Sequence, residues 1–355
     1  MRDYTEDASI ERPALNLLAS LGYEPLNAFM EKLDYCPVTG RASQREVVLR
    51  AHLRQALHDL NPQLSSSVIE AAMTALTADR SSLGLVRTNQ AIYHLLKDGV
   101  PVQVPASDQP GEETREELVK VIDWNNPDKN RFHAVSQFWV KGEVYRRRAD
   151  LVLFMNGLPL VLFELKAQHR RLSNAYTGNL SDYKDTIPHL FAYNALIILS
   201  NGRESLFGSL TADWEHFFTW KKIVSEGEQG VVSLETMIRG ICTPERLLDL
   251  VENFTLFSKA RGGLLKILGQ NHQYLGVNQA FASVCARQEN QGRLGVFWHT
   301  QGSGKSYSMV FLAQKVLRKL TGNWTFLVVT DREDLDDQIY QTFADAGVVQ
   351  ESREF

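Results

Sequence analysis

The chain has 355 residues, of which 44% are hydrophobic and 23% are charged, as in ordinary globular proteins. Because a domain usually takes roughly 100–200 residues, this length predicts two domains. The formal net charge of -4 excludes a globally basic nucleic-acid-binding protein, so any contact with DNA must come from local basic patches.

The three cysteines, Cys36, Cys242 and Cys285, lie far apart and have no metal-binding spacing. We expect buried thiols in a reducing compartment. The acidic N-terminus is interrupted by Pro13 and does not resemble a signal peptide. No apolar run approaches the roughly 18 residues of a membrane span, so we expect a cytoplasmic protein without membrane contact.

The first third of the sequence predicts helices. Residues 43–60, 67–76 and 114–124 each begin with a Ser or Thr followed three positions later by Glu, which is capping-box spacing before an amphipathic run. The capping pairs are Ser43 and Glu46, Ser67 and Glu70, and Thr114 and Glu117. Residues 97–113 are rich in Pro and Gly and predict an exposed loop or edge segment.

Strands are predicted from Phe132 onward. Residues 131–166 contain three β-rich runs, the last two joined at Asn156-Gly157, a strong hairpin signal. Residues 194–210 predict further strands, and residues 243–257 a helix that closes the first domain. We place the domain boundary between residues 258 and 259. The alternation of helices and strands over residues 259–355 predicts a parallel α/β sheet.

The string HTQGSGKS has the composition of a phosphate-binding loop between a strand and a helix. The backbone of Gly302, Ser303 and Gly304 would curl so that its N–H groups face an anion. Lys305 would reach the β- and γ-phosphates of ATP, and the Ser306 hydroxyl would bind Mg²⁺. The N-terminus of the following helix would also face the phosphates.

This loop departs from the strict pattern at His299, where the first Gly is expected. The alternative is a glycine-rich turn that binds no nucleotide. The next strand, in TFLVVTDRED, follows the loop's helix too soon to be the acidic Walker B strand, so we interpret it as a DNA-touching segment. We therefore expect the 355 residues to lack the Walker B acid, the arginine finger and a second motor lobe, and not to hydrolyse ATP at a useful rate.

A second constellation is formed by Asp150, Glu164 and Lys166. Glu164 and Lys166 end an apolar strand and, being two residues apart, share a face. Two carboxylates can hold a Mg²⁺ that activates water, and a lysine can stabilise developing negative charge. The alternative is an ordinary salt bridge between Glu164 and Lys166 or a neighbour.

The hairpin register decides whether these carboxylates meet. A strict two-residue turn at Asn156-Gly157 puts Asp150 opposite Phe163 and turns Glu164 to the other face. One extra residue or a bulge puts Asp150 directly opposite Glu164. We predict a three-residue or bulged connection, which Pro159 favours.

Two basic clusters flank these residues and are candidates for binding DNA phosphates. The alternative is a solvated charged edge. The clusters are Arg146, Arg147 and Arg148, and His169, Arg170 and Arg171.

With these motifs, the chain resembles the N-terminal part of the restriction and motor subunit of type I restriction endonucleases. Asp150…Glu164-x-Lys166 matches the PD-(D/E)xK nuclease signature, and WHTQGSGKSYSM and VVTDREDLDDQI match motifs I and Ia of a superfamily 2 motor. The resemblance implies a mixed-sheet, restriction-endonuclease-like domain followed by the first part of a RecA-like domain. It further implies Mg²⁺ bound by Asp150 and Glu164, ATP, double-stranded DNA, and methyltransferase and specificity subunits, S-adenosylmethionine being expected only for the partners.

The resemblance also adds supporting residues. Asn179 stands where the family's QxxxY motif has Gln, with Tyr183 in register. Glu11 is a candidate for the N-terminal helical glutamate that completes such sites, the alternative being an exposed acid at a helix start. Gln273 lies in a segment similar to the adenine-reading region.

Other functions remain open from the sequence. One is a nuclease–helicase fusion in another defence or repair system without methylation partners. Another is a degenerate nuclease fold that serves as a DNA-binding or assembly module, against which the intact Asp, Glu and Lys argue. A plain P-loop kinase leaves some 260 residues of the chain unexplained.

Overall fold

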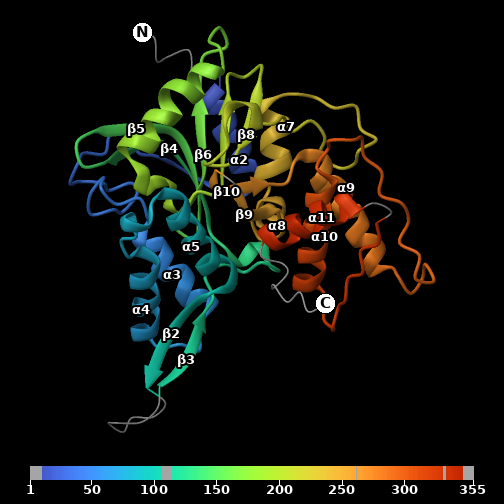
Figure 1. Ribbon diagram of the computed structural model, residues 1–355. Coiled ribbons are helices and arrows are strands. Elements are labelled where there is room, and N and C mark those ends of the chain that lie inside the picture. Colours follow the sequence, from blue (N-terminus) through green and yellow to red (C-terminus); the bar gives the residue numbers. More distant parts are fainter. Residues whose placement is uncertain (1–9, 106–113, 261, 331–332, 347–355) are drawn as a thin grey trace.

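The computed structural model describes residues 10–105, 114–260, 262–330 and 333–346 (Figure 1). Its centre is a mixed six-stranded sheet with strand order β1-β4-β5-β6-β7-β8. The pairs β1–β4 and β6–β7 are parallel and the others antiparallel. The strands are β1 (Glu24–Asn27), β4 (Phe132–Lys141), β5 (Arg146–Met155), β6 (Leu158–Leu165), β7 (Leu196–Ser200) and β8 (Ser205–Gly208). The mixed sheet predicted for the first part of the chain is confirmed.

The β5–β6 hairpin forms the middle of this sheet. Asn156 and Gly157 have φ of 51° and 81°, the left-handed backbone that a two-residue hairpin turn requires. The register then shifts between Leu153 and Phe154, so that Leu151 pairs with Phe163. Every residue of β6 is buried, as expected for a central strand covered on both faces. The predicted bulge is confirmed.

Helices surround the sheet. Helix α2 packs against β1 and β4, the π-helix η4 against β6, and α6 against β5. Helices α3, α4 and α5 lie together at the end of the sheet from which the paired strands β2 (Val100–Pro105) and β3 (Thr114–Val119) extend (Figure 1). The helices are α2 (Arg12–Ser20), α3 (Arg50–Leu60), α4 (Ser66–Thr77), α5 (Leu85–Asp98), η4 (Ala175–Leu180), α6 (Ser181–Thr186), α7 (Leu234–Met237) and α8 (Pro244–Asn253). Short helical turns comprise Ser81–Leu83, Pro127–Lys129, Pro188–Ala192, Trp214–His216 and Ile238–Cys242.

Three predictions in the first third were wrong in detail. Residues 43–49 are not helical. Glu46 accepts a hydrogen bond from the backbone N–H of Ala42, and the buried Gln44 donates its side-chain amide to the carbonyl of Glu31. These contacts hold the segment in an irregular conformation. Helix α4 begins one residue early, after Ser65. Residues 114–119 form strand β3 (Thr114–Val119), paired with β2 (Val100–Pro105), because the alternating valines of β2 offer a partner that outweighs the local capping signal.

The last part of the chain contains β9 (Thr255–Ala260), β10 (Gly263–Leu268), α9 (Asn271–Cys285), α10 (Lys305–Lys319) and α11 (Glu333–Asp345). The parallel sheet predicted here is not formed, because residues 293–304 and 320–330 contain no strand. Leu327 and Val329 are 87% and 83% exposed. A parallel strand needs a neighbour to satisfy its backbone, and the described residues provide none. The proposed boundary at 258/259 falls inside β9.

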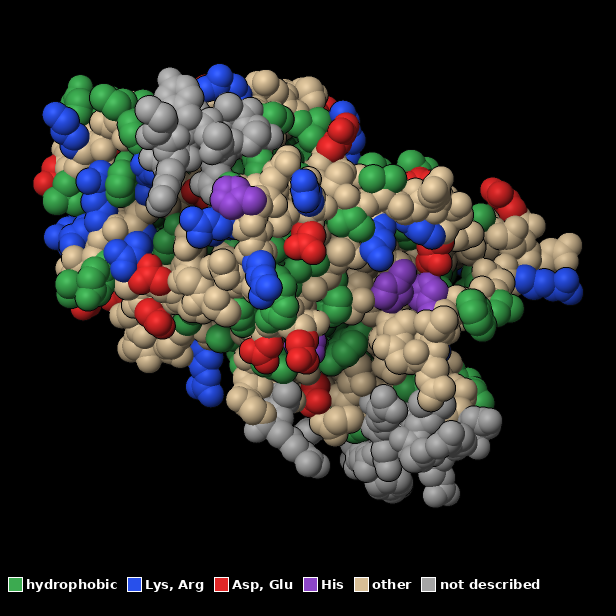
Figure 2. All heavy atoms as spheres, turned by 90° about the horizontal axis from the view of Figure 1, so that it is seen from above, with side chains coloured by type: hydrophobic (Ala, Val, Ile, Leu, Met, Phe, Trp, Pro, Cys, Tyr) green, Lys and Arg blue, Asp and Glu red, His purple; other side chains and the backbone are tan. Residues whose placement is uncertain are grey.

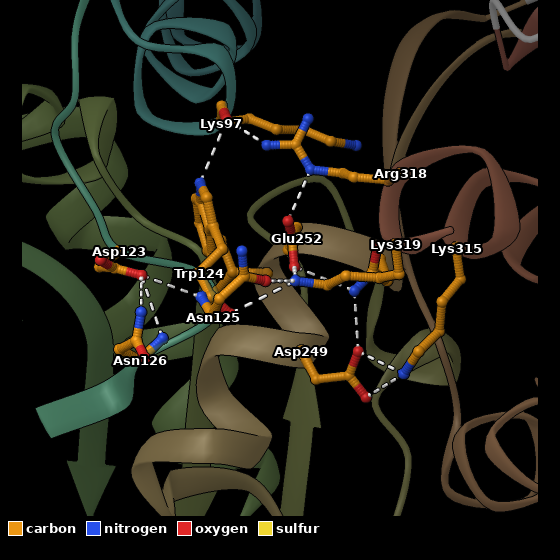
Figure 3. A network of polar contacts seen from close by, with 12 residues as sticks. Lys97, Asp123, Trp124, Asn125, Asn126, Asp249, Glu252, Lys315, Arg318 and Lys319 are labelled. Atoms are coloured by element: carbon orange, nitrogen blue, oxygen red, sulfur yellow. Dashed lines mark hydrogen bonds and ion pairs between the residues drawn. The ribbon is translucent and has the colours of Figure 1, made fainter. Parts of the chain in front are cut away.

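The C-terminal half of α10 is anchored to α8 by ion pairs (Figure 3). Lys315 pairs with Asp249 at 2.6 Å, and Arg318 and Lys319 pair with the buried Glu252 at 2.6 and 2.5 Å. Among the described residues, no helix is long and apolar enough to cross a membrane.

The cysteine prediction holds for two of the three residues. Cys36 and Cys242 are buried free thiols, but Cys285 is exposed. It ends α9, where the chain leaves the packed helix for an irregular segment.

Candidate functional site

The structure brings Asp150, Glu164 and Lys166 together where β5 and β6 lie side by side. Continuing the bulged register from the Leu151–Phe163 pair places Asp150 opposite Glu164. Asp150 Oδ2 accepts from the backbone N–H of Leu165 at 2.7 Å, and Lys166 Nζ lies 2.6 Å from Glu164 Oε1. The hairpin geometry therefore puts two carboxylates and an amine within one small volume.

Glu164 is the most buried member, with 1% of its surface exposed. Burial raises the pKa of its carboxyl well above the usual range, and the Asp150 carboxylate raises that pKa further, whereas Lys166 and Asn179 oppose the shift. Asn179, on η4, donates its amide N–H to Glu164 Oε1. Within the described part of the chain, Glu164 Oε2 has no hydrogen-bond partner.

A buried carboxylate oxygen without a donor, next to a second carboxylate, suits a hard divalent cation that takes oxygen ligands. The described residues contain no cluster of three or more His, Cys, Asp and Glu side chains suited to a metal. The carboxylates that could hold such a cation here are those of Asp150 and Glu164, with water or substrate oxygens completing the coordination shell.

Tyr183 and Glu11, which were also expected to support this site, lie on different elements: Tyr183 in α6 and Glu11 directly before α2. Tyr183 donates its hydroxyl to the carbonyl of Arg148 at 2.8 Å. Burial, with the nearby Glu164 and Asp150 carboxylates, raises the pKa of Tyr183 above its ordinary value, so the phenol stays neutral. Glu11, just before α2, is buried rather than exposed, and its Oε2 accepts from the amide of Gln137 at 2.5 Å.

The predicted phosphate-binding loop has two glycines with a left-handed backbone and a helix after it, but no strand before it in the described part of the chain. Gly302 and Gly304 have φ of 79° and 75°, and α10 begins at Lys305, directly after Gly304. Lys305 Nζ donates to the carbonyls of His299 and Thr300, both at 3.0 Å, so the amine folds back over the loop. Ser306 lies in the first turn of α10.

Helix α9 lies against this loop. Gln273 donates its amide to the Gly304 carbonyl at 3.0 Å, and its oxygen accepts from the backbone of Gln270 at 2.9 Å. His272 Nε2 lies 2.9 Å from the Ser303 carbonyl. Beside them is a hollow of about 260 Å³, whose lining includes Gln270, Asn271, His272, Lys221, Lys222 and Glu226.

Comparison with known families gives two matches. The model described as Type I restriction enzyme R protein N terminus matches residues 3–216, more than half of the chain. The chain belongs to this family. The SWI2/SNF2 ATPase model matches residues 272–354, which include the predicted phosphate-binding loop and α10.

Relatives cover almost the whole chain. It is 38% identical over 350 residues to the Type I restriction enzyme HindI endonuclease subunit of Haemophilus influenzae, covering 94% of this chain and 32% of the relative. It is 29% identical over 371 residues to the Putative type I restriction enzyme MjaIXP endonuclease subunit of Methanocaldococcus jannaschii, covering 96% of this chain and 34% of that relative. The chain thus spans about a third of the length of these family members.

The residues of the first predicted basic cluster, Arg146 to Arg148, make two kinds of contact. The guanidinium carbons of Arg146 and Arg148 lie 3.8 and 5.2 Å from the centre of the Trp139 ring, whereas Arg147 forms an ion pair with Asp182 of α6. In Figure 2, Lys and Arg side chains gather among hydrophobic ones at the end where Figure 1 places β5. Arg146 is exposed, and Arg147 and Arg148 are half-buried.

The second basic cluster is exposed. Arg170 and Arg171 follow β6 in an irregular segment that starts beside Lys166. Their contact with DNA stays a prediction. Asp331 and Arg332 of the second motor segment lie outside the described residues.

The sequence did not predict several residues that lie near the two candidate sites. Trp139 and Gln137 belong to the strand SQFWV, where no motif points to them. His272 precedes Gln273 and was visible in the NHQY segment, but its contact with the phosphate-binding loop depends on how α9 packs.

Proposed function

We propose that this chain carries the DNA-cleaving centre of a type I restriction subunit, a Mg²⁺-dependent endonuclease acting on double-stranded DNA. The observation that carries the proposal is the convergence of Asp150, Glu164 and Lys166, with a Glu164 oxygen left for a cation. The names of the relatives, type I restriction enzyme endonuclease subunits, agree with it.

Each residue has a distinct role in this proposal. Asp150 and Glu164 would hold Mg²⁺, which polarises a phosphodiester and lowers the pKa of bound water when present. Lys166, directly after β6 and with 18% of its side chain exposed, would leave Glu164 and stabilise negative charge developing on the phosphate. Asn179 would keep Glu164 oriented from η4, a role typical of groups that hold a metal ligand from outside. Arg146, Arg148, Arg170 and Arg171 would bind DNA phosphates.

We further propose that residues 259–355 begin a RecA-like motor that drives DNA translocation with ATP. In this proposal the left-handed Gly302 and Gly304 would shape an anion-binding loop at the N-terminus of α10. Lys305 would leave the loop carbonyls to bind phosphates, and Ser306 would bind Mg²⁺. Gln273 would contact adenine; its neighbour His272 lines the hollow of about 260 Å³ beside the loop. The SWI2/SNF2 ATPase match supports this assignment.

The subunit would act in a complex. The relatives are named as endonuclease subunits of type I restriction enzymes, which supports methyltransferase and specificity subunits as partners. We assign DNA-site recognition and S-adenosylmethionine to those partners.

The test is plasmid nicking and linearisation by a complete subunit carrying this sequence, with its partners, Mg²⁺ and ATP. Glu164→Ala is compared with wild type and with Glu143→Ala, which changes an exposed glutamate on the β4–β5 connection. We expect cleavage to disappear only in Glu164→Ala while ATP hydrolysis persists in all three. Equal cleavage by Glu164→Ala and wild type would mean that Glu164 and Lys166 form a structural salt bridge.

A further inference from the structure

The irregular segment that follows β6 carries Lys166, Arg170 and Arg171. In the proposed function, the amine of Lys166 acts on the phosphate and the two arginines bind DNA. Both arginine side chains are exposed. Which points their guanidinium groups can reach therefore depends on the path of the backbone from residue 166 to residue 171.

The turn between β7 and β8 lies against this segment at three alternate positions. The backbone N–H of Lys166 donates to the carbonyl of Ser200 at 2.8 Å. A Cβ atom at position 202 would lie 3.6 Å from Cγ of Gln168. The side-chain amide of Asn201 donates to the carbonyl of Arg170 at 3.0 Å. The turn therefore accompanies the segment from the lysine to the first arginine.

Asn201 uses both ends of its side-chain amide. Its Oδ1 accepts from the backbone N–H groups of Arg203 at 3.0 Å and Glu204 at 2.8 Å, which closes the turn, while its Nδ2 donates to Arg170. Asn201 is only 4% exposed, so water does not readily replace these partners, and losing one of them leaves a buried polar group unsatisfied. Asn201 thus fixes the turn and the arginine-bearing segment relative to each other.

The turn is itself well anchored. The hydroxyls of Ser200 and Ser205, which pair across β7 and β8, lie 2.8 Å apart, and Ser200 Oγ accepts from the backbone N–H of Gly202 at 3.1 Å. A segment held against such a support already has its path before a ligand arrives. It then loses less conformational freedom when DNA binds, which favours binding.

We propose that Asn201 is a positioning residue for DNA binding, which holds residues 166–171 in place and acts through Arg170 and Arg171. This inference rests on the proposed function, since it needs the two arginines to contact DNA phosphates. From the sequence, Asn201-Gly202 indicates only a turn.

The test is binding of a fluorescein-labelled double-stranded DNA fragment to the 355-residue chain, measured by anisotropy in EDTA at several salt concentrations. EDTA removes divalent cations, so the result does not depend on the carboxylate site. Asn201→Ala should raise the Kd about fivefold, the factor that corresponds to ordering one long side chain on binding. Because both arginines remain, the slope of log Kd against log salt concentration should equal that of wild type.

The variant Arg170→Ala/Arg171→Ala shows what loss of the contacts themselves does. Its salt dependence should decrease by about 1 for each phosphate contact removed. Adding Asn201→Ala to this variant should raise the Kd no further, because no arginine of the segment remains to be positioned. A further loss in the triple variant would reject the positioning role, since Asn201 would then affect DNA binding by another route.

Asn61→Ala is the matched control. Asn61 is 2% exposed, its Nδ2 donates to the carbonyl of Lys120 at 2.8 Å, and its Oδ1 accepts from the N–H of Lys120 at 2.9 Å, so it also joins two backbone segments. Both asparagine variants should lower the Tm, but only Asn201→Ala should weaken DNA binding. Equal weakening by both variants would show that Asn201 has a merely structural role.

Failure of the proposed function would look different. Lower affinity in Arg170→Ala/Arg171→Ala together with an unchanged Kd in Asn201→Ala would overturn the positioning role alone. Wild-type affinity in Arg170→Ala/Arg171→Ala, or absence of DNA binding by wild type, would reject the DNA contacts proposed for the two arginines and the positioning role with them.

Discussion

The side-chain amide of Gln273 donates to the carbonyl of Gly304 at 3.0 Å, which connects α9 to the predicted phosphate-binding loop. A Cβ atom at position 304 would lie 2.7 Å from Gln273 Nε2, closer than Cβ contacts found in proteins. Because Gln273 Nε2 is the free end of a flexible side chain and can move aside, the left-handed φ of 75° is the stronger reason for glycine at position 304.

Gly304→Ala should weaken ATP binding by at least about tenfold, because left-handed strain alone costs about 1–2 kcal/mol and the displaced Gln273 adds to it. The measurement is titration with a fluorescent ATP analogue. Gly292→Ala is the control, since Gly292 has a similar φ of 78° but nothing within 4 Å of its Cβ position. Equal losses in both variants would show that the contact with Gln273 is unimportant.

Lys166→Ala should abolish DNA cleavage by the complete subunit and leave ATP hydrolysis intact, because Lys166 contacts Glu164 and lies outside the phosphate-binding loop. Lys305→Ala should abolish both activities, since cleavage by such an enzyme would depend on translocation. Plasmid cleavage and phosphate release are measured on the same preparations. Loss of ATP hydrolysis in a normally folded Lys166→Ala variant would contradict this division of labour.

The site could be predicted from the sequence where its geometry follows from local rules. Asn156-Gly157 indicated the turn, and the requirement that Asp150 face Glu164 demanded one extra residue in the register. The structure has that residue as Leu160 of β6, which lies between Pro159 and Val161 where the register with Phe154 and Leu153 shifts. Successive side chains of a strand point to opposite faces of the sheet. A shift of one residue in the register therefore determines which side chains meet.

Features that depend on distant neighbours were not predictable. Residues 114–119 carry a helix-start signal but pair with β2, and Gln137 has no turn residue beside it to indicate a positive φ. The strands expected around the phosphate-binding loop are a third case. Their apolar residues suit a buried sheet, but Val296 is 93% exposed because the described residues supply no adjacent strand.

Glu252→Ala should destabilise the chain by about 3–5 kcal/mol, because Arg318 and Lys319 would lose the carboxylate that they share in a largely buried network (Figure 3). Glu252 is only 3% exposed. Denaturant unfolding of the 355-residue chain measures the effect. Glu70→Ala breaks an ion pair with Arg54 whose side chains are 46% and 49% exposed, and should cost less than about 1 kcal/mol. Similar costs for both variants would show that α10 is not anchored through Glu252.

Lys266 on β10 should make stability depend on pH. Its amine is buried, donating to Asn89 Oδ1 at 3.0 Å and to the Asn194 carbonyl at 2.6 Å, and burial lowers the pKa of Lys266 to about 7 from an ordinary value of 10.5. Between these two values the unfolded chain holds a proton that the folded chain has released. The free energy of unfolding should therefore rise with pH over this window.

Lys266→Met keeps an unbranched side chain but removes the titrating amine, so its free energy of unfolding should rise less between pH 7 and pH 9 than that of wild type. Denaturant titrations at several pH values provide the free energies of unfolding. Subtracting the values of the variant from those of wild type removes the contributions of the other titrating groups. Lys259→Met, an exposed lysine on the neighbouring strand β9, should follow wild type. Parallel profiles for wild type and Lys266→Met would mean that Lys266 stays protonated in the folded protein, with the two oxygen acceptors compensating its burial.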